Sequence, residues 1–414
     1  MKHIEVSAVI GCIVKVIVDR PLGTYHPKHK DIYYPVNYGY IPGVIAPDGE
    51  EQDAYILGID EPVKEFVGQV IAIIRRFDDI EDKWVVAPEN VFFTKEEIMA
   101  QVAFQEQYFQ TEVQMARKIL VTGGTVFVSR FVANYFAQKG DDVYVLNRNS
   151  KPQLPNVTLI EGDRNDLGDK LKGYEFDAVL DITAYTREHV ENLVNALGKF
   201  GDYIMVSSSA VYPETNPQPF TEEQTCGPNV HWGAYGTNKL ATEGYLRQAV
   251  PHAYILRPPY LYGPMQNVYR EPFVFECAEA GRRFYIPGDG SMKLQFFHVE
   301  DLCRFIEILL EKHPEERVYN VGNPNAETIS EWVKLCYNVV GANLETVQVE
   351  GHPQRAYFCF HDYDYYLDVT KQMTLMSDVK PLAEGLRESY ELFQQHREGV
   401  MRRPYMEYID VNLK

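Results

Sequence analysis

The first part of the chain alternates short apolar runs with turn residues. The apolar runs, rich in β-branched and aromatic residues, span 13–19, 55–58, 68–75 and 84–86. The segments between them contain proline, glycine and aspartate, as in Pro47-Asp48-Gly49, so the pattern predicts short strands joined by loops. A helix is predicted next, because Thr94 can cap it and Glu97 can complete a capping box. Segment 111–116 is expected to end that helix.

From Arg117 onward the pattern changes to strand, glycine turn, helix and strand. Buried strands are predicted over 118–121, 143–146, 157–160 and 178–182, with a helix over 129–139. This alternation is typical of parallel βαβ units. We therefore expect an α/β protein in which a small N-terminal β-barrel domain (1–114) precedes a doubly wound Rossmann domain with a smaller C-terminal substrate part (115–414).

Composition and charge narrow the class of protein. The 414 residues are 45% hydrophobic and 13% aromatic, which is enough for packed cores, and the net charge is −19. Such a charge repels phosphate backbones, so nucleic acid is not expected as the main partner. No apolar run reaches the ~18 residues of a membrane span, and Met1 to Glu5 do not resemble a signal peptide. The six cysteines lack paired spacing. We expect a cytoplasmic protein, without a membrane partner, that forms a homo-oligomer.

Carboxylates gather just before the second predicted strand, at 55–58. Asp48, Glu50 and Asp53 fall within one turn, and a second acidic group follows at 78–82. Crowded carboxylates repel one another unless a cation compensates, and oxygen ligands without histidine or cysteine favour Mg²⁺. Two such ions could activate water against a phosphate substrate. A solvated acidic turn explains the spacing equally well. Basic and phenolic groups that could hold phosphoryl oxygens are nearby: Arg20, His26, Lys28, Tyr34, Tyr38 and Lys83.

Three motifs in this region resemble the family I soluble inorganic pyrophosphatases. They are Asp19-Arg20-Pro21-Leu22-Gly23, the Tyr34-to-Ile41 run and the 48–53 acidic loop followed by Glu81-Asp82-Lys83. The resemblance covers about 110 residues. It implies a β-barrel that hydrolyses pyrophosphate, with Mg²⁺ held by Asp48, Glu50, Asp53, Asp79 and Asp82. It also implies that Asp53 lies beside the attacking water and that Tyr38 and Lys28 or Arg20 contact phosphate.

The chain also departs from the pyrophosphatase pattern. Glu50 stands where aspartate is usual, and an ungapped match places Trp84, not Lys83, at an expected phosphate-binding lysine. A helix replaces the late Tyr-Lys pair of the family. An inactive oligomerisation module is therefore the alternative for this domain.

A glycine-containing turn follows the strand at 118–121. The run Gly123-Gly124-Thr125-Val126-Phe127 opens a helix, where a dinucleotide pyrophosphate would bind. Val126 and Ser129 replace two glycines of the usual fingerprint, so an ordinary strand–turn–helix is the alternative. The next strand ends without an acid for ribose hydroxyls. Arg148 could instead pair with a 2′-phosphate, which favours NADP over NAD. Asp163 could bind the adenine amine or only cap a helix.

A tyrosine and a lysine four residues apart follow a serine-rich strand end. Tyr235 and Lys239 lie on one face of a predicted helix, so the ammonium can favour the phenolate. A tuned phenol can act as acid or base near neutral pH. A serine of the 207–209 run could hold the substrate oxygen.

This set resembles the extended short-chain dehydrogenases of the NAD-dependent epimerase/dehydratase family. Further motifs that recur there are Arg257 to Pro264, Pro287 to Gly290, Phe297 to Leu302 and Tyr319 to Gly322. The resemblance implies Tyr235 as acid/base, Lys239 as its partner and cofactor ligand, and Ser208 as substrate donor, with Ser209 as fallback. It implies an NAD(P)-dependent enzyme that acts on a nucleotide-sugar-like substrate.

The altered glycine loop is most similar to an atypical subgroup related to chloroplast stem-loop RNA-binding proteins. A cofactor-sensing or RNA-associated protein with little catalysis is therefore the alternative for the second domain. His298 and Asp301 are expected to fix a loop. Arg270, Arg282, Arg283 and Lys293 are expected to be surface charges rather than ligands of a substrate phosphate.

Overall fold

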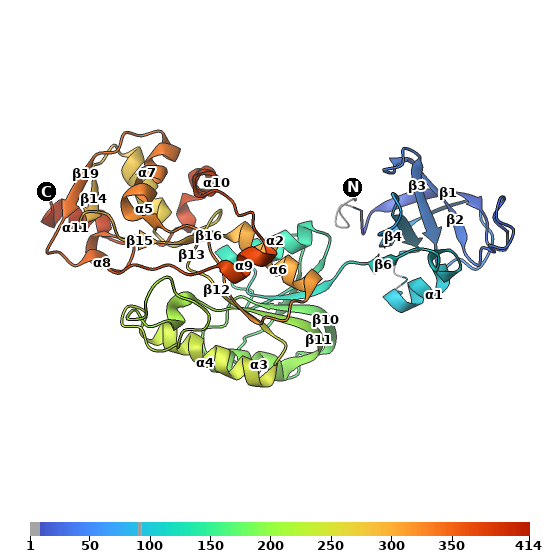
Figure 1. Cartoon of the computed structure of the whole chain (residues 1–414), viewed down its shortest axis with the longest axis horizontal. Helices are drawn as coiled ribbons and strands as arrows, with labels where there is room; N and C mark the ends of the chain where they lie inside the picture. Colours follow the sequence, from blue (N-terminus) through green and yellow to red (C-terminus); the bar gives the residue numbers. More distant parts are fainter. Residues whose placement is uncertain (1–8, 90, 92) are drawn as a thin grey trace. The chain divides into compact units, whose positions relative to one another are not determined.

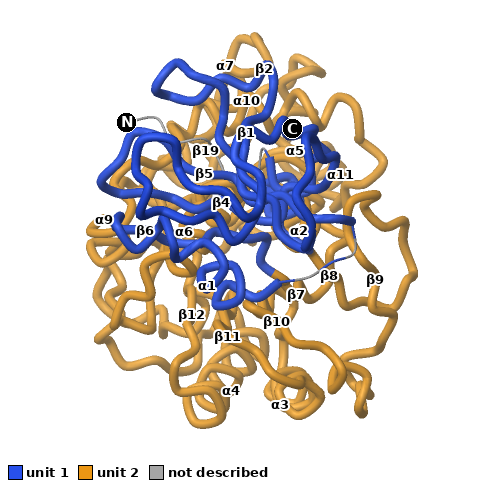
Figure 2. Tube along the Cα trace, turned by 90° about the vertical axis from the view of Figure 1, so that its right-hand side faces the viewer, with its two compact units in different colours: residues 1–117, 136–142 blue, residues 118–135, 143–414 orange. Residues whose placement is uncertain are grey.

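The computed structural model describes residues 9–89, 91 and 93–414 and divides the chain into two compact units. The first unit comprises residues 1–117 and 136–142, and the second comprises 118–135 and 143–414 (Figure 2). The first five residues, on which the expected lack of a signal peptide rests, lie outside the described residues. Within the described part of the chain, no helix has the length and hydropathy that crossing a membrane requires.

The first unit contains a closed five-stranded barrel. Its strands are β1 (Ile13–Arg20), β2 (Asn37–Ile45), β3 (Glu51–Ile56), β4 (Glu65–Arg76) and β5 (Lys83–Ala87). They are ordered β1-β2-β3-β5-β4, and β1 also pairs with β4, so these five strands close into a barrel. The predicted barrel is confirmed as a fold. Its core includes Tyr34, Tyr38 and Tyr55, all buried.

The helix of this unit, α1 (Lys95–Glu106), has the predicted capping box. The Thr94 hydroxyl accepts from the Glu97 backbone N–H, and the Glu97 carboxylate accepts from the Thr94 N–H. The prediction for the segment after it is wrong, because Thr111–Gln114 forms strand β6. This strand pairs antiparallel with β4, a partner far away in sequence.

The second unit is built on a seven-stranded sheet of order β17-β12-β11-β10-β7-β8-β9. The strands are β7 (Lys118–Thr122), β8 (Asp142–Asn147), β9 (Thr158–Glu161), β10 (Leu171–Asp181), β11 (Leu197–Val206), β12 (Tyr254–Arg257) and β17 (Val318–Asn320). Helices α3 (Arg187–Ala196) and α4 (Ala234–Ala249) lie on one side, and α2 (Phe127–Gln138) and α6 (Val299–Lys312) on the other (Figure 1). The strand order reverses between β7 and β10, and ligands bind at such a switch point in open α/β sheets.

The rest of the second unit packs small strand pairs against helices. Its strands are β13 (Tyr260–Tyr262), β14 (Phe284–Pro287), β15 (Lys293–Leu294), β16 (Phe296–His298), β18 (Glu327–Thr328) and β19 (Thr346–Val349). Its helices are α5 (Glu271–Glu279), α7 (Ile329–Val340), α8 (Gln354–Tyr357), α9 (Thr370–Leu375), α10 (Leu382–Gln395) and α11 (Tyr405–Asn412). Aromatic side chains fill their core, as in the stacked pair of Phe296 and Trp332.

Candidate active site of the second unit

The turn between β7 and α2 requires its glycines. Gly123 and Gly124 have φ values of +98° and +89°, which residues other than glycine rarely adopt. A Cβ at Gly124 would lie 2.5 Å from Val145 Cγ1, and one at Gly123 would lie 2.7 Å from Ser129 Oγ. The chain therefore passes close to β8 and then enters α2, leaving Thr125, Val126 and Phe127 at the helix N-terminus.

The strand ends beside this turn hold the other residues predicted to bind cofactor. Asn147 Nδ2 donates to the Gly123 carbonyl at 2.6 Å, so the residue in the place of the usual acid supports the turn. Arg148 is exposed at the end of β8. Asp163 accepts hydrogen bonds from the backbone N–H and side-chain amide of Asn165, and these bonds lower the pKa of its carboxyl. Asp163 thus closes a local turn.

Tyr235 and Lys239 lie one turn apart at the start of α4. Lys239 is 2% exposed, and its Nζ donates to the Val206 carbonyl at 2.8 Å. Burial lowers the pKa of Lys239 to about 8, against the opposing charge of Asp181. Burial raises the pKa of Tyr235 to about 12, and a hydrogen bond with Ser208 opposes this rise. Burial thus shifts the two pKa values in opposite directions, and it does not bring the pKa of the phenol closer to neutral pH.

The serines after β11 have different partners. Ser209 Oγ bonds to Tyr365 OH and to the Pro258 carbonyl at 2.9 Å, and Ser207 Oγ donates to Glu243 at 2.6 Å. Ser208 accepts from the Ala210 N–H at 3.2 Å and is the serine that interacts with Tyr235. The geometry therefore singles out Ser208 over the fallback Ser209.

Ser207, Ser208, Tyr235 and Lys239 line a cavity of about 500 Å³. It extends from Val126 and Phe127, at the N-terminus of α2, to the C-terminal part of the unit. Several lining residues were not predicted from the sequence: Tyr185, Trp232, His361 and Arg355. Arg270, expected to be a surface charge, also lines this cavity, and its Nε has no hydrogen-bond partner among the described residues. Except for Trp232, three positions before Tyr235, these residues come from distant segments, so no local signal in the sequence links them to Tyr235. Arg282 instead pairs with Asp410, and Arg283 and Lys293 are exposed, as expected.

A buried carboxylate beneath the site was also not predicted. Asp181, fully buried at the end of β10, accepts from Thr122 at 2.8 Å, Tyr203 at 2.8 Å and both terminal nitrogens of Arg164 at 2.9 and 3.0 Å. Arg164 and the other donors lower the pKa of Asp181, although burial opposes this. This network joins the ends of β7 and β10 at the switch point. His298 and Asp301 likewise have structural roles, since His298 caps α6 and Asp301 accepts the Lys380 N–H.

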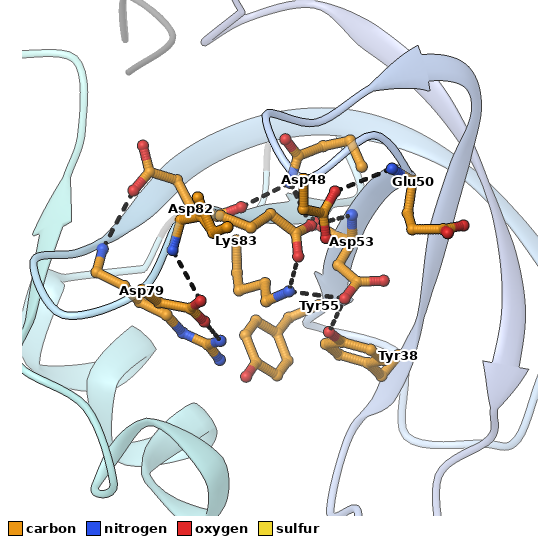
Figure 3. Close-up of polar contacts among 12 residues, drawn as sticks. Tyr38, Asp48, Glu50, Asp53, Tyr55, Asp79, Asp82 and Lys83 are labelled. Carbon is orange, nitrogen blue, oxygen red and sulfur yellow. Dashed lines mark hydrogen bonds and ion pairs between the residues drawn. The ribbon is translucent and has the colours of Figure 1, made fainter. Parts of the chain in front are cut away.

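The barrel has its own cluster of charged groups, built around Asp53 and Lys83 (Figure 3). Lys83 Nζ contacts Asp53 Oδ2 at 2.7 Å and also the carboxylate of Glu81, and Tyr38 OH donates to Asp53 Oδ2 at 2.6 Å. Lys83 and Tyr38 are 4% and 1% exposed. Glu81 was not among the magnesium ligands implied by the pyrophosphatase resemblance. It is the acid that shares the Lys83 ammonium with Asp53. Arg20 lies over the Tyr38 ring at 5.0 Å, and Lys28 is exposed.

The five predicted magnesium ligands are not brought together. Asp79 pairs with Arg76 at 2.8 Å, Asp82 accepts the Arg76 N–H at 3.1 Å, and Asp48 accepts the Glu50 N–H at 3.0 Å. Across the described ranges, the only group with three potential ligand atoms within 4.8 Å is His298, Glu300 and Glu388, in the second unit, and Lys380 already binds both glutamates there. Asp53 and Asp79 already pair with Lys83 and Arg76, and among the described residues no three of the five acids come within ligand distance of one another, so the arrangement does not fit a magnesium site.

Comparisons with known proteins agree with the geometry of the second unit. The sequence model of the NAD dependent epimerase/dehydratase family matches residues 119–322. A chloroplast stem-loop binding protein of 41 kDa from Arabidopsis thaliana is 30% identical over 305 residues, which are 67% of this chain and 79% of that protein. A dTDP-4-dehydro-6-deoxy-D-allose reductase from Streptomyces bikiniensis is 25% identical, covering 68% of this chain and 97% of the reductase.

Solved structures show the same fold. UDP-glucose 4-epimerase from Thermotoga maritima, solved with UDP-glucose, has a TM-score of 0.56 at 22% identity and covers 67% of this chain and 99% of its own. A dTDP-glucose 4,6-dehydratase from Bacillus anthracis, solved with NAD, has a TM-score of 0.55 at 20% identity and covers 69% and 99%. The fold and site define a dinucleotide-binding enzyme of the short-chain dehydrogenase type. The chain belongs to the NAD-dependent epimerase/dehydratase family.

Proposed function

We propose that the second unit is an NAD(P)-dependent oxidoreductase that acts on a carbinol or ketone of a nucleotide sugar. One observation carries this proposal: Tyr235, Lys239 and Ser208 line the same cavity as Val126 and Phe127, at the N-terminus of α2. The names of related proteins support the substrate class, since they include a reductase, an epimerase and dehydratases of dTDP- and UDP-linked sugars.

Each residue has a defined task in this proposal. Tyr235 takes a proton from, or returns it to, the substrate oxygen, and Ser208 donates a hydrogen bond to that oxygen. Lys239 keeps the phenolate accessible through its charge. Gly123, Gly124, Thr125, Val126 and Phe127 would hold the cofactor pyrophosphate at the helix N-terminus, Arg148 a 2′-phosphate, Asp163 the adenine amine, and Lys239 the nicotinamide ribose. The bound cofactor would supply the two-electron acceptor or donor.

Binding and turnover together test this function. Calorimetric titration of the full chain with NAD and NADP is expected to give saturable binding, tighter for NADP if Arg148 pairs with the 2′-phosphate. Arg148→Ala should then reduce the NADP preference. Tyr235→Phe should retain cofactor binding and lose turnover of nucleotide sugars about 100-fold or more. Absence of binding for both cofactors would refute the proposal.

RNA association is the second candidate for this unit, because the 30% identical relative is a stem-loop binding protein. The net charge of −19 opposes it. Filter binding with structured RNA at low salt separates the two candidates. Specific RNA binding that weakens steeply with salt, together with no cofactor binding, would favour RNA association.

Pyrophosphate hydrolysis by the barrel stays a prediction from resemblance. The convergence of Tyr38, Asp53 and Lys83 supports an interaction with a phosphate-like anion, whereas the pairing of Asp79 with Arg76 and of Asp53 with Lys83 argues against bound magnesium. A linked assay for phosphate release, with and without Mg²⁺, tests hydrolysis in the full chain. Asp53→Ala is the matched variant, and no release in either protein would leave the barrel as a non-catalytic, oligomerising module.

A further inference from the structure

The titratable groups of the catalytic cavity are phenols, cations, one imidazole and one thiol. Of the described residues that line it, none is an aspartate or glutamate. The groups that carry or exchange a proton are Tyr185, Tyr235, Lys239, Tyr260, Arg270, Arg355, Cys359, His361 and Tyr365. This inventory limits which reactions of the family the site can perform.

Redox exchange at one carbinol carbon requires one acid–base group. In oxidation, the C–H hydrogen leaves with its electron pair to the cofactor, and the O–H proton moves to the Tyr235 phenolate, giving a ketone. In reduction, the hydrogen and its electron pair return to carbon and Tyr235 returns the proton to oxygen. Return to the opposite face of the sugar gives an epimer, and reduction of a supplied ketone gives an alcohol. Tyr235, with Lys239 and Ser208, is sufficient for these steps.

Elimination of water requires two further groups. A base must remove a C–H proton beside the ketone, and an acid must protonate the departing hydroxyl; both work best when their pKa is near the working pH. The two arginines stay protonated and cannot act as bases. His361 is a weak base, because burial, Arg355 and His231 lower its pKa to about 4.

The contacts of these groups also tie them to other tasks. Lys239 Nζ lies over the Tyr185 ring at 5.3 Å from the centroid, and His361 packs edge-on against Trp232 at 4.9 Å. Tyr365 is bonded to Ser209, and Arg355 to the Cys359 carbonyl. A neighbouring cavity of about 570 Å³ contains one carboxylate, Glu271, which is fully buried.

We propose that this site performs redox exchange at a single carbinol carbon, as an epimerase or ketoreductase, and does not eliminate water from the sugar. The proposal rests on the oxidoreductase function proposed above and narrows it. Two observations support it. One phenol–ammonium couple, Tyr235 and Lys239, lines the cavity, and none of the described lining residues is a carboxylate.

Solvent exchange tests the proposal. The full chain with oxidised or reduced cofactor is incubated in D₂O with UDP- and dTDP-hexoses and with a nucleotide 4-keto sugar whose binding is first shown by calorimetry. We expect epimerised or reduced sugar without deuterium on any carbon. We also expect the ketone to exchange no C–H hydrogen beyond the rate without protein. Loss of one water from the product, or protein-dependent deuterium at the carbon beside the ketone, would overturn the inference.

Variants separate the possible failures. Tyr235→Phe should lose turnover about 100-fold or more, whereas Tyr245→Phe, a matched change on the outer part of α4, should retain it. If solvent exchange occurs, its loss in Glu271→Gln would identify the unpredicted acid and refute the inference, while cofactor binding and Tyr235 dependence would still uphold the oxidoreductase function. If neither cofactor binds, the proposed function fails and the inference with it.

Discussion

Lys239 shows how a single residue can be placed for chemistry at a cost in stability. Its pKa is about 10.5 in an unfolded chain and about 8 when buried beside Tyr235, so at neutral pH the fold must bury an ammonium. This cost is fully present below about pH 8 and disappears as the pH rises toward the unfolded pKa, because the unfolded chain binds more protons in that range. The residue is therefore expected to be retained for its charge rather than its packing.

Replacing the lysine tests this argument. Lys239→Met should raise the free energy of unfolding at about pH 7, since up to about 3 kcal/mol of burial cost is removed and only about 1 kcal/mol is lost with the bond to Val206. Turnover should fall and its pH profile should shift to higher pH, since the phenolate loses its partner. Chemical denaturation at several pH values should show the stability difference between variant and parent shrinking toward about pH 10. A destabilised variant with an unchanged pH profile would contradict this account.

The placement of Tyr235 and Lys239 on one helix could be predicted from the sequence because it is local. Both lie in α4, one helical turn apart, and both line the same cavity. Their catalytic role stays a prediction. Arg270 and His361 could not be predicted, because long-range folding alone brings them to the cavity. The same limit applies to Glu81: its position beside Asp53 and Lys83 depends on the pairing of β3 with β5.

At the scale of elements, local capping was easier to predict than strand pairing. The capping box of α1 depends on residues three apart, and it is present as predicted. Thr111–Gln114 was misassigned because it becomes a strand only through its pairing with β4. The glycine turn lies between these cases. Its glycines indicate a tight turn, but the contact that requires Gly124 is with Val145 on the neighbouring strand.

A pair of glycine substitutions tests the turn as an element. Gly124→Ala should destabilise the second unit by about 2–4 kcal/mol and abolish cofactor binding, because it combines positive φ with a Cβ 2.5 Å from Val145. Gly244→Ala in α4 is the control, since its Cβ would meet nothing within 4 Å and alanine favours a helix. Thermal unfolding with and without NADP measures both effects. Equal behaviour of the two variants would refute the role of the turn.

At the scale of the whole molecule, each unit has its own hydrophobic cores. Tyr34, Tyr55 and Ile98 belong to a core of the barrel unit, whereas Leu120, Leu193 and Tyr203 belong to a core of the sheet in the second unit. The change in sequence pattern near residue 115 could be recognised because short strands and loops give way to alternating strands and helices. The function of the barrel unit was harder to predict than that of the second unit. Asp53, Glu81 and Asp79 bind protein cations, and the spacing of carboxylates along the sequence does not reveal this.

Separate cores predict separate responses to mutation. Lys83→Met should lower the unfolding temperature of the barrel unit, because it leaves Asp53 and Glu81 close together without their shared cation, at a cost of about 3–5 kcal/mol. Lys15→Met is the control, since Lys15 forms an exposed pair with Glu65 worth at most about 1 kcal/mol. NADP should raise only the transition of the second unit, and its affinity should be the same in both variants. Calorimetry of the full chain measures both transitions, and a weakened NADP affinity in Lys83→Met would show that the two units are energetically coupled.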